Sequence, residues 1–400
     1  MKKVLMVTTI GGFLPQFEWN DVKLLRNMGC SIDYASDFKN PIYRFDKDEL
    51  ESEGIKLHQI DIKKSPFRVV CNVRAVMELK AIIDREKITL IHCHNPMGGV
   101  TARIAAGLSR RKPYVIYTAH GLHFYKGAPL KNWLLYYPAE RMLARLTDRI
   151  VTINEEDRDR AFTLPLRHKG AVHRIHGVGV DRERFRPKPE IREAMRKSLD
   201  IPEDAFHIVT AAELNDNKNQ ACVIRAIGLI KKNYPEFGNR ICYSLCGRGD
   251  KERDLKELIH SEGLDGQVRL LGYRNDMEDV LQSADCFAFP SKREGLGIAA
   301  VEALLCGVPL IVSDNRGTRE YAKNKSNALV CKNNAPESFA KAISRLASDK
   351  TLRNRYADRC RESAIPFTTE EVEKTMINVY ESAFEDIRFG RNGGRQAVKI

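Results

Sequence analysis

Short apolar runs rich in β-branched and aromatic residues alternate with amphipathic helical stretches along most of the chain. Segments with helical periodicity lie between several of these runs, for example Val73–Arg85 and Ala139–Leu146. Strands joined by helical crossovers pair in parallel, so the pattern predicts a parallel sheet covered by helices on both faces. In the first half of the chain, strands are expected at Val4–Thr9, Ser31–Ala35, Leu57–Ile62, Leu90–His94, Tyr114–Thr118, Arg149–Asn154 and Val172–His176.

The alternation breaks at residues 176–189, HGVGVDRERFRPKP, where glycines, charged residues and two prolines favour a linker. It resumes beyond that segment, and Glu370–Asp386 is expected to form a last helix followed by a frayed tail. Strands of the second half are expected at His207–Ala212, Ile241–Cys246, Val268–Gly272, Cys286–Pro290, Leu310–Ser313 and Ala328–Cys331.

The pattern therefore predicts an α/β protein with two Rossmann-like domains that face each other across a cleft. A chain of 400 residues is too long for one ordinary core. We expect an N-terminal domain over residues 1–178 and a second domain over 179–369. Residues 370–400 would form a helix, packed back towards the N-terminal domain, and a tail. Ligands of such sheets bind beyond the carboxyl ends of the strands, so the cleft is the expected active site.

Composition narrows the class of protein. A content of 43% hydrophobic and 30% charged residues is typical of a globular chain and excludes disordered and fibrous proteins. No apolar run approaches the roughly 20 residues of a membrane span, and the opening MKKVLMVTTIGG is interpreted as a strand rather than a signal peptide. Ten cysteines without a Cys-x-x-Cys pair are expected to be buried thiols in a reducing, cytoplasmic compartment.

Positive charge is concentrated in the first half of the chain. The net charge is +13, and residues 1–180 carry 29 lysines and arginines against 19 acidic residues. Such an excess favours a partner that bears phosphates, which could be nucleic acid, an anionic membrane or a phosphorylated substrate. No RNP-like, helix-turn-helix or zinc-finger pattern is present, so we expect no nucleic-acid partner.

The most informative segment is CFAFPSKREGLGIAAVEALLCGVPLIVSD, residues 286–314. A helix that starts at Gly295, Leu296, Gly297 and Ile298 presents unpaired N–H groups and a positive dipole end, which suit a diphosphate. Glu294 precedes that helix start, and Glu302 lies about two turns later among apolar residues, where an unpaired carboxylate is costly. The alternative interpretation is an ordinary βα loop with surface glutamates.

This segment resembles the family 4 glycosyltransferases, retaining enzymes of the GT-B fold, and in particular those of bacterial surface polysaccharides. The Glu-x7-Glu spacing in EGLGIAAVE is the family signature. Further motifs extend the resemblance over nearly the whole chain: TAHGLHF (118–124), HGVGVDRERF (176–185), ELNDNKNQ (213–220), LCGRGDKERDL (245–255), RLLGYRNDMEDVLQSADCFAFPS (269–291) and GTREY (317–321).

The resemblance implies a role for each matching residue of the second domain, which would bind the nucleotide sugar. Glu294 would bind hydroxyls of the donor sugar and stabilise charge at the anomeric carbon, whereas Glu302 would hold the ribose hydroxyls. Lys218 would pair with the diphosphate, where positive charge stabilises the leaving group. Tyr273 and Arg274 would line the base pocket.

In the N-terminal, acceptor-side domain, the resemblance places His120 against the donor sugar. Gly12 follows the first strand, where a glycine allows a phosphate or acceptor to approach the backbone closely. Each also has a structural alternative, a buried histidine and a simple turn. No full G-x-G-x-x-G motif is present, so the pattern gives no indication of a nicotinamide cofactor.

One position departs from the family. Many relatives carry an arginine that pairs with the diphosphate beside the lysine, and Glu213 stands in its place. A glutamate cannot bind phosphate in this way, so the second positive contact must come from elsewhere. Arg319 and Arg248 are weak candidates.

We expect neither a metal nor a cofactor. Side chains alternate along a strand, and we therefore expect His92 and His94 to lie on opposite faces and not to share an ion. Asp157-Arg158-Asp159 and Asp46-Lys47-Asp48 match Asp-x-Asp, but both are interpreted as solvated surface. The family resemblance likewise implies a metal-independent enzyme.

A basic and aromatic stretch could rest on an anionic membrane. It comprises the basic segment SRRKP at residues 109–113 and HFYKGAPLKNWLLYYP at residues 123–138. The alternative is that Leu134, Leu135 and the tyrosines belong to the core.

Together these features predict a retaining glycosyltransferase that uses a nucleotide sugar, most simply a UDP-sugar. The acceptor would be a lipid-linked diphosphate saccharide or another saccharide in cell-surface polysaccharide assembly, with the enzyme peripheral on the inner face of the membrane. Two alternatives stay open: an epimerase or hydrolase of nucleotide sugars with the same fold, and a binding module without catalysis.

Overall fold

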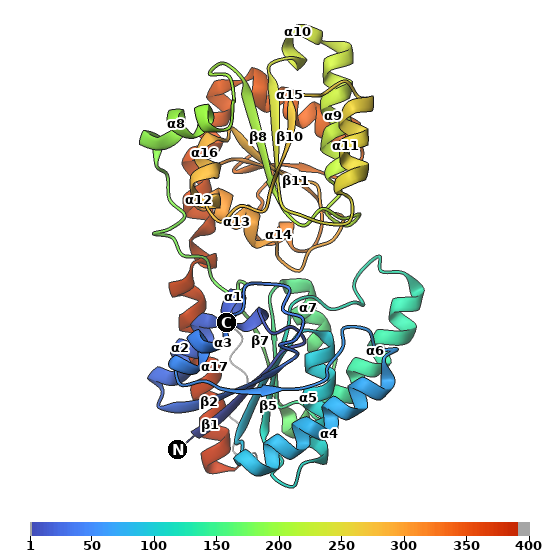
Figure 1. The fold of residues 1–400 in the computed structure, drawn as a ribbon, viewed down its shortest axis with the longest axis vertical. Coiled ribbons are helices and arrows are strands. Elements are labelled where there is room, and N and C mark those ends of the chain that lie inside the picture. Colours follow the sequence, from blue (N-terminus) through green and yellow to red (C-terminus); the bar gives the residue numbers. More distant parts are fainter. Residues whose placement is uncertain (1, 391–400) are drawn as a thin grey trace. The chain divides into compact units, whose positions relative to one another are not determined.

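A computed structural model describes residues 2–390 (Figure 1). The chain divides into two compact units: unit 1 is Met1–Gly179 with Glu370–Ile400, and unit 2 is Val180–Thr369. The sequence prediction set the boundaries after residues 178 and 369 and grouped the last helix with the first domain. The frayed tail was predicted over residues 388–400, but residues 388 and 389 still belong to the last helix, and residues 391–400 lie outside the described part of the chain.

Unit 1 is built on a seven-stranded sheet in the order β3-β2-β1-β4-β5-β6-β7, in which all neighbours pair in parallel. Apolar side chains fill both faces of its central strands, as a sheet covered on both sides requires. The strands are β1 (Lys2–Val7), β2 (Cys30–Ser36), β3 (Lys56–Gln59), β4 (Leu90–His94), β5 (Tyr114–Ala119), β6 (Arg149–Thr152) and β7 (Ala171–Arg174).

Helices cover this sheet on both faces (Figure 1). The last helix, α17, returns to it: the Tyr380 hydroxyl lies 2.8 Å from His92 Nδ1, and Asp386 accepts hydrogen bonds from Tyr114 and Arg149. The helices are α1 (Phe13–Phe17), α2 (Trp19–Asn27), α3 (Lys47–Ser52), α4 (Val69–Glu86), α5 (Pro96–Leu108), α6 (Leu130–Ala144), α7 (Glu155–Ala161) and α17 (Thr369–Phe389).

Unit 2 repeats the architecture with a six-stranded parallel sheet in the order β10-β9-β8-β11-β12-β13. Its strands are β8 (Phe206–Ala211), β9 (Ile241–Cys246), β10 (Val268–Gly272), β11 (Cys286–Phe289), β12 (Leu310–Ser313) and β13 (Ala328–Cys331). Its helices are α8 (Arg192–Ser198), α9 (Gln220–Asn233), α10 (Pro235–Gly238), α11 (Glu252–Ser261), α12 (Met277–Val280), α13 (Ile298–Leu305), α14 (Thr318–Tyr321), α15 (Pro336–Ser348) and α16 (Lys350–Ala364).

Each expected strand is present within two or three residues of its predicted ends. The largest error concerns α6, which begins at Leu130 although the pattern predicted a helix only from Ala139. Pro138 lies inside this helix and obscured its first turns in the sequence. All ten cysteines are free thiols, and nine of them are buried. Among residues 2–390, no helix combines the length and the apolarity that crossing a membrane requires.

The strand order reverses once in each sheet, between β1 and β4 in unit 1 and between β8 and β11 in unit 2. Connections leave such a switch point in opposite directions, so the loops beyond its carboxyl edge have room for a ligand. The segments that follow β1, β4, β8 and β11 carry most of the predicted site residues.

A buried ion pair ties α5 to α6 within unit 1. The Arg103 guanidinium is fully buried, contacts both carboxylate oxygens of Glu140, and stacks over the Tyr117 ring at 4.0 Å. The attraction between the two charges offsets the free-energy cost of removing them from water, and it does so only while both partners are present.

We predict that Arg103→Met lowers the free energy of unfolding of unit 1 by about 3–5 kcal/mol, because it leaves the Glu140 carboxylate buried and unpaired. The double variant Arg103→Met, Glu140→Leu should recover most of the loss, since both charges are then gone. Urea unfolding curves of the three proteins measure the effect. Equal destabilisation of single and double variants would show that packing, not the charge, is responsible.

Candidate active site

The start of α13 in unit 2 is shaped by a glycine that no other residue can replace. Gly297 has φ +96°, and a Cβ atom there would lie 2.5 Å from the Phe289 ring and 2.9 Å from the Tyr321 hydroxyl. α13 then begins at Ile298, where no side chain caps the helix and the Ala300 N–H donates to the Gly297 carbonyl. The N–H groups of Ile298 and Ala299 have no partner within the helix. The predicted helix start is thus present, directly after β11 and its loop.

Lys218 and Glu294 meet at the switch point of unit 2. Lys218 lies in the loop after β8, Glu294 in the loop after β11, and the Lys218 Nζ donates to Glu294 Oε1 at 2.6 Å. Both side chains are largely buried. Asn217 joins the two loops by donating its side-chain N–H to the Arg293 carbonyl at 2.9 Å. An anion that approaches Lys218 therefore competes with a carboxylate that is already in place.

Glu302 is half-buried on α13, about one turn beyond the helix start. Burial raises the pKa of its carboxyl to about 7; the Arg184 charge acts in the opposite direction, and the Glu278 charge adds to the rise. Arg184 is itself engaged with Glu278, at 2.9 Å between Nη2 and Oε2. Glu302 is thus a carboxyl of high proton affinity with no strong partner of its own, suited to accept hydroxyl hydrogen bonds.

Tyr273 and Arg274, predicted to line the base pocket, follow β10. β9 and β8 separate this strand from β11 in the sheet. Tyr273 is exposed, and Arg274 donates two hydrogen bonds to the Asp276 carboxylate. The structure therefore places them at the same sheet edge as Glu294 but pairs Arg274 within its own loop.

The structure shows the surroundings of Glu213 and of the two predicted substitutes for the missing arginine. Arg319 is engaged with Asp314 at 2.6 Å, and Arg248 is exposed, as is Glu213. The structure offers Arg316 instead, a buried residue whose Nε donates to the Glu294 carbonyl at 3.3 Å. Sequence reasoning missed it although it lies in NRGTREY, next to a quoted motif.

Tyr321 was also missed. Its buried hydroxyl has no hydrogen-bond partner among the described residues, and the nearby Glu294 charge, together with burial, raises the pKa of the phenol well above its usual range. An unpaired buried hydroxyl is costly, so a polar ligand group is a plausible partner for it. Its position beneath Gly297 could not be inferred from spacing alone.

In unit 1, His120 follows β5 and stands at the carboxyl edge of the sheet. Its ring packs edge-on against Phe13 at 5.1 Å, and its Nε2 lies 3.3 Å from His94 Nδ1 and 3.3 Å from Glu18 Oε1. Burial lowers the pKa of His120 to about 4, so the ring is neutral at physiological pH. A neutral imidazole can donate with one nitrogen and accept with the other.

Gly12 is needed for a different reason from the one predicted. A Cβ atom on Gly12 would lie 2.6 Å from the Tyr43 carbonyl oxygen. In the structure, the group that lies close to Gly12 is the backbone of Tyr43, and it fills the space where a Cβ atom would stand.

The prediction for His92 and His94 is wrong. Residues two apart on a strand share a face, and the two rings lie side by side with centroids 4.1 Å apart and a tilt of 41°. Both are fully buried beneath His120. The argument that they could not share an ion therefore fails.

One of the two Asp-x-Asp predictions also fails. Asp157 is fully buried rather than solvated; its carboxylate accepts from Asn154 Nδ2 and from the Leu122 N–H. It serves the start of α7, where Asn154 in turn accepts from the Asp157 N–H. Asp46 similarly caps the start of α3.

The aromatic residues of α6 belong to the core, whereas the leucines of its first half do not. Trp133, Tyr136 and Tyr137 pack against the core of unit 1. Leu130 and Leu134 are 73% and 70% exposed, and Leu135 is exposed as well. The core interpretation therefore holds for the tyrosines and fails for Leu134 and Leu135.

Comparison with known proteins decides the family. Residues 4–154 match the family model "Glycosyl transferase 4-like", and residues 191–363 match "Glycosyl transferases group 1". The putative glycosyltransferase EpsD of Bacillus subtilis (strain 168) is 36% identical over 388 residues, which cover 96% of this chain and 98% of the relative. The chain is a member of the GT-B glycosyltransferases.

Further relatives agree with this assignment. The UDP-Gal:alpha-D-GlcNAc-diphosphoundecaprenol alpha-1,3-galactosyltransferase of Escherichia coli is 27% identical over 304 residues, 74% of this chain and 76% of that enzyme. Among solved structures, Anabaena HepE in complex with UDP-glucose superposes with a TM-score of 0.77 at 17% identity, over 96% of this chain and all of HepE. The predicted family, fold and enzyme class are thereby confirmed: this protein is a glycosyltransferase.

We predict that Glu302→Gln makes the glycosyltransferase more stable at neutral pH. The folded pKa of about 7 lies above the unfolded value of 4.5, so the folded state holds the proton longer and wild-type stability falls as pH rises through that interval. The variant lacks this loss. Its free energy of unfolding should therefore exceed that of the wild type by about 1–3 kcal/mol near pH 8, and the two should not differ below pH 4.5.

Unfolding curves at several pH values measure the difference, with the exposed Glu257→Gln as matched control. Parallel pH profiles for wild type and Glu302→Gln would contradict the assignment of the raised pKa to Glu302.

Proposed function

We propose that unit 2 binds a UDP-sugar and that the enzyme transfers the sugar, with retention of its anomeric configuration, to a lipid-linked diphosphate saccharide. The transfer would serve cell-surface polysaccharide assembly. The observation that carries the donor assignment is the Lys218–Glu294 pair beside the start of α13, with Glu302 about one turn further on. In this arrangement, the Lys218 cation and the N–H groups at the helix start suit the diphosphate, and the Glu302 carboxyl further along the helix suits the ribose.

The choice of UDP rests on relatives. The HepE structure holds UDP-glucose, and the E. coli relative is named as a UDP-galactose enzyme. In the proposed complex, the diphosphate takes Lys218 and the helix start, and Glu302 accepts from the ribose hydroxyls. Glu294, released from Lys218, would then accept from sugar hydroxyls.

For the chemical step we propose transfer on one face of the sugar. The glycosidic C–O bond to the diphosphate breaks, and the acceptor hydroxyl oxygen bonds to the anomeric carbon from the same side. The proton of that hydroxyl passes to a diphosphate oxygen, so no protein base is required. Lys218 stabilises the leaving negative charge, and Glu294 and the neutral His120 stabilise the positive charge on the sugar.

The acceptor assignment has two supports. The name of the E. coli relative specifies a diphosphoundecaprenol-linked saccharide, and residues 1–180 carry a surplus of ten positive charges. Positive charge of this kind is attracted both by the diphosphate of a lipid carrier and by the anionic membrane that surrounds it.

Two exposed apolar patches of unit 1 support membrane contact. The first patch lies on α6 and consists of Leu130, Leu134, Leu135 and Met142. The second lies on α4 and just before its start, and consists of Phe67, Val69, Val70, Val73 and Met77. Both helices neighbour α5 (Figure 1). Basic residues flank each patch, among them Arg68, Arg74, Lys131 and Arg141. Apolar side chains edged by cations suit the interface of an anionic membrane.

For the donor, calorimetric titration with UDP, GDP and ADP should show selective binding of UDP. Glu302→Ala should weaken that binding about 10–100-fold, since it removes a charged hydrogen-bond acceptor. Glu257→Ala, an exposed glutamate of the same unit, serves as matched control. The donor site is refuted if no diphosphate nucleoside binds, or if UDP binds Glu302→Ala as it binds wild type.

With the donor known, product analysis separates the proposed transfer from its alternative. A transferase should consume donor only when a polyprenyl-diphosphate saccharide is supplied and should yield a retained anomeric configuration. Equal donor consumption without acceptor would instead support a hydrolase or an epimerase.

For the membrane, we predict that Leu130→Ser with Leu134→Ser reduces binding to anionic vesicles at least about 10-fold, because each leucine loses about 1.5–3 kcal/mol of transfer energy when fully buried. Cosedimentation with phosphatidylglycerol vesicles measures the loss. Tyr234→Ser, an exposed apolar position of unit 2, should leave binding unchanged. Unchanged binding of the double leucine variant would remove α6 from the interface.

A further inference from the structure

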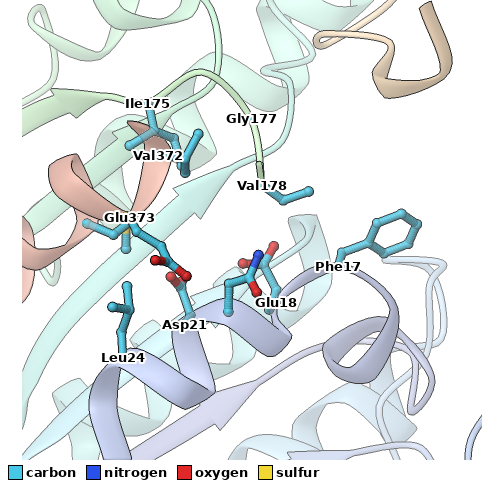
Figure 2. A pocket seen from close by; sticks show the side chains of 11 residues that line it. Phe17, Glu18, Asp21, Leu24, Ile175, Gly177, Val178, Val372 and Glu373 are labelled. Atoms are coloured by element: carbon cyan, nitrogen blue, oxygen red, sulfur yellow. The ribbon is translucent and has the colours of Figure 1, made fainter. Parts of the chain in front are cut away.

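A cluster of buried carboxyls and imidazoles lies beneath His120 in unit 1. Glu18 follows α1, Asp21 lies on α2, and His92 and His94 lie on β4. Glu18 and Asp21 are both more than nine-tenths buried, and His92 and His94 are fully buried. Figure 2 shows Glu18 and Asp21 on the chain from α1 to α2, with Glu373 of α17 opposite Asp21. The donor-binding role proposed above uses only His120 of this cluster.

Among the described residues, Glu18 and Asp21 form ion pairs only with histidines. Glu18 Oε1 faces His94 and His120, and Asp21 Oδ2 lies 3.6 Å from His92 Nδ1. Imidazole nitrogens and carboxylate oxygens both carry lone pairs that can bind a metal ion.

Three ligand atoms in this cluster are equally spaced. Glu18 Oε1 lies 3.4 Å from His94 Nδ1 and 3.3 Å from His120 Nε2, and the two nitrogens are 3.3 Å apart. A tetrahedral ion with bonds of about 2.0–2.1 Å separates its ligands by about 3.3–3.4 Å. The three atoms therefore form one face of a tetrahedron of the size that zinc requires.

Hydrogen bonding does not account for this spacing. One proton can bridge the two imidazole nitrogens, but Glu18 Oε1 is buried and has no hydrogen-bond partner among the described residues. A buried carboxylate oxygen without a partner is costly. An ion at the centre of the three atoms would satisfy all of them at once.

We propose that Glu18, His94 and His120 bind one divalent transition-metal ion of the zinc class. Two imidazoles and one carboxylate are a ligand set that zinc uses in proteins with an open fourth position. That position falls on the His120 side, since His120 is the one ligand of the three that is partly exposed. The ion would fix the junction of α1 and α2 to the carboxyl ends of β4 and β5.

The three ligands all belong to unit 1, so this site can be tested apart from UDP binding by unit 2, although His120 also takes part in the transfer step proposed above. The other ring nitrogen of His120 stays available for a sugar hydroxyl. Asp21 and His92 form a second group with His94, with ligand atoms within 4.8 Å of one another, so Asp21 is an outer neighbour of the proposed ion.

The test is zinc binding by the full-length protein, freed of metal by a chelator and titrated with Zn²⁺ against a chromophoric competitor. We expect one Zn²⁺ per chain, bound at least about 100-fold more weakly in Glu18→Gln and in His94→Gln. His260→Asn, which removes an exposed His–Asp pair, should leave this binding unchanged. Asp21→Asn should weaken it less than Glu18→Gln does.

Several results would overturn the proposal: no stoichiometric binding, binding that survives Glu18→Gln, or a larger loss in Asp21→Asn than in Glu18→Gln. If the Glu18 and His94 variants do not fold, Co²⁺ bound to the wild type decides. The intense visible bands of tetrahedral Co²⁺ support the site, and a weak octahedral spectrum refutes it. UDP binding is measured separately, so failure of either proposal leaves the other standing.

Discussion

Parallel strand pairing is the constraint on which both polar clusters depend. Because every neighbouring pair in the two sheets is parallel, all carboxyl ends of a sheet meet at one edge, and the crossovers diverge where the strand order reverses. Lys218 after β8 thereby meets Glu294 after β11, although 76 residues separate them in the chain. In the same way, Glu18, which follows β1, reaches His94 at the end of β4. Topology brings these side chains together; their local sequence only supplies the chemistry.

The glycosyltransferase carries functional groups that its stability does not favour. The Tyr321 hydroxyl is buried without a partner, and Glu302 is desolvated enough to raise its pKa to about 7. Elsewhere in the molecule buried charge is compensated, as between Arg103 and Glu140. Buried polar atoms without a partner among the described residues also occur away from the two sites, at Ser31, Arg196 and Tyr356. Tyr321 beside Glu294, and Glu18 beside His120, are the ones that a ligand at the proposed sites could reach.

Much of the fold could be predicted from the sequence, because buried parallel strands leave continuous apolar runs bounded by glycine, proline and polar residues. The strands followed from this pattern, whereas the early start of α6 did not, since Pro138 inside a helix looks like its boundary. A motif along the chain was enough to assign roles to Glu294, Glu302 and Lys218, and these roles stay predictions. Glu18, Arg316 and Tyr321 were missed because only tertiary structure gathers them. His92 and His94 were misassigned by a wrong use of strand alternation, not by any lack of signal.

The two units stabilise their buried carboxylates in different ways. This difference bears on the role that each carboxylate could have in ligand binding. In unit 2 the cation is a side chain: Lys218 holds Glu294 at 2.6 Å, and a diphosphate that replaces Glu294 on Lys218 would exchange one anion for another at little electrostatic cost. The released carboxylate would then be turned to the sugar. In unit 1, Glu18 Oε1 is buried without a hydrogen-bond partner among the described residues, and the nitrogens of His94 and His120 lie near it. These two histidines, at the end of β4 and after β5, are the groups that would bind the proposed metal ion together with Glu18.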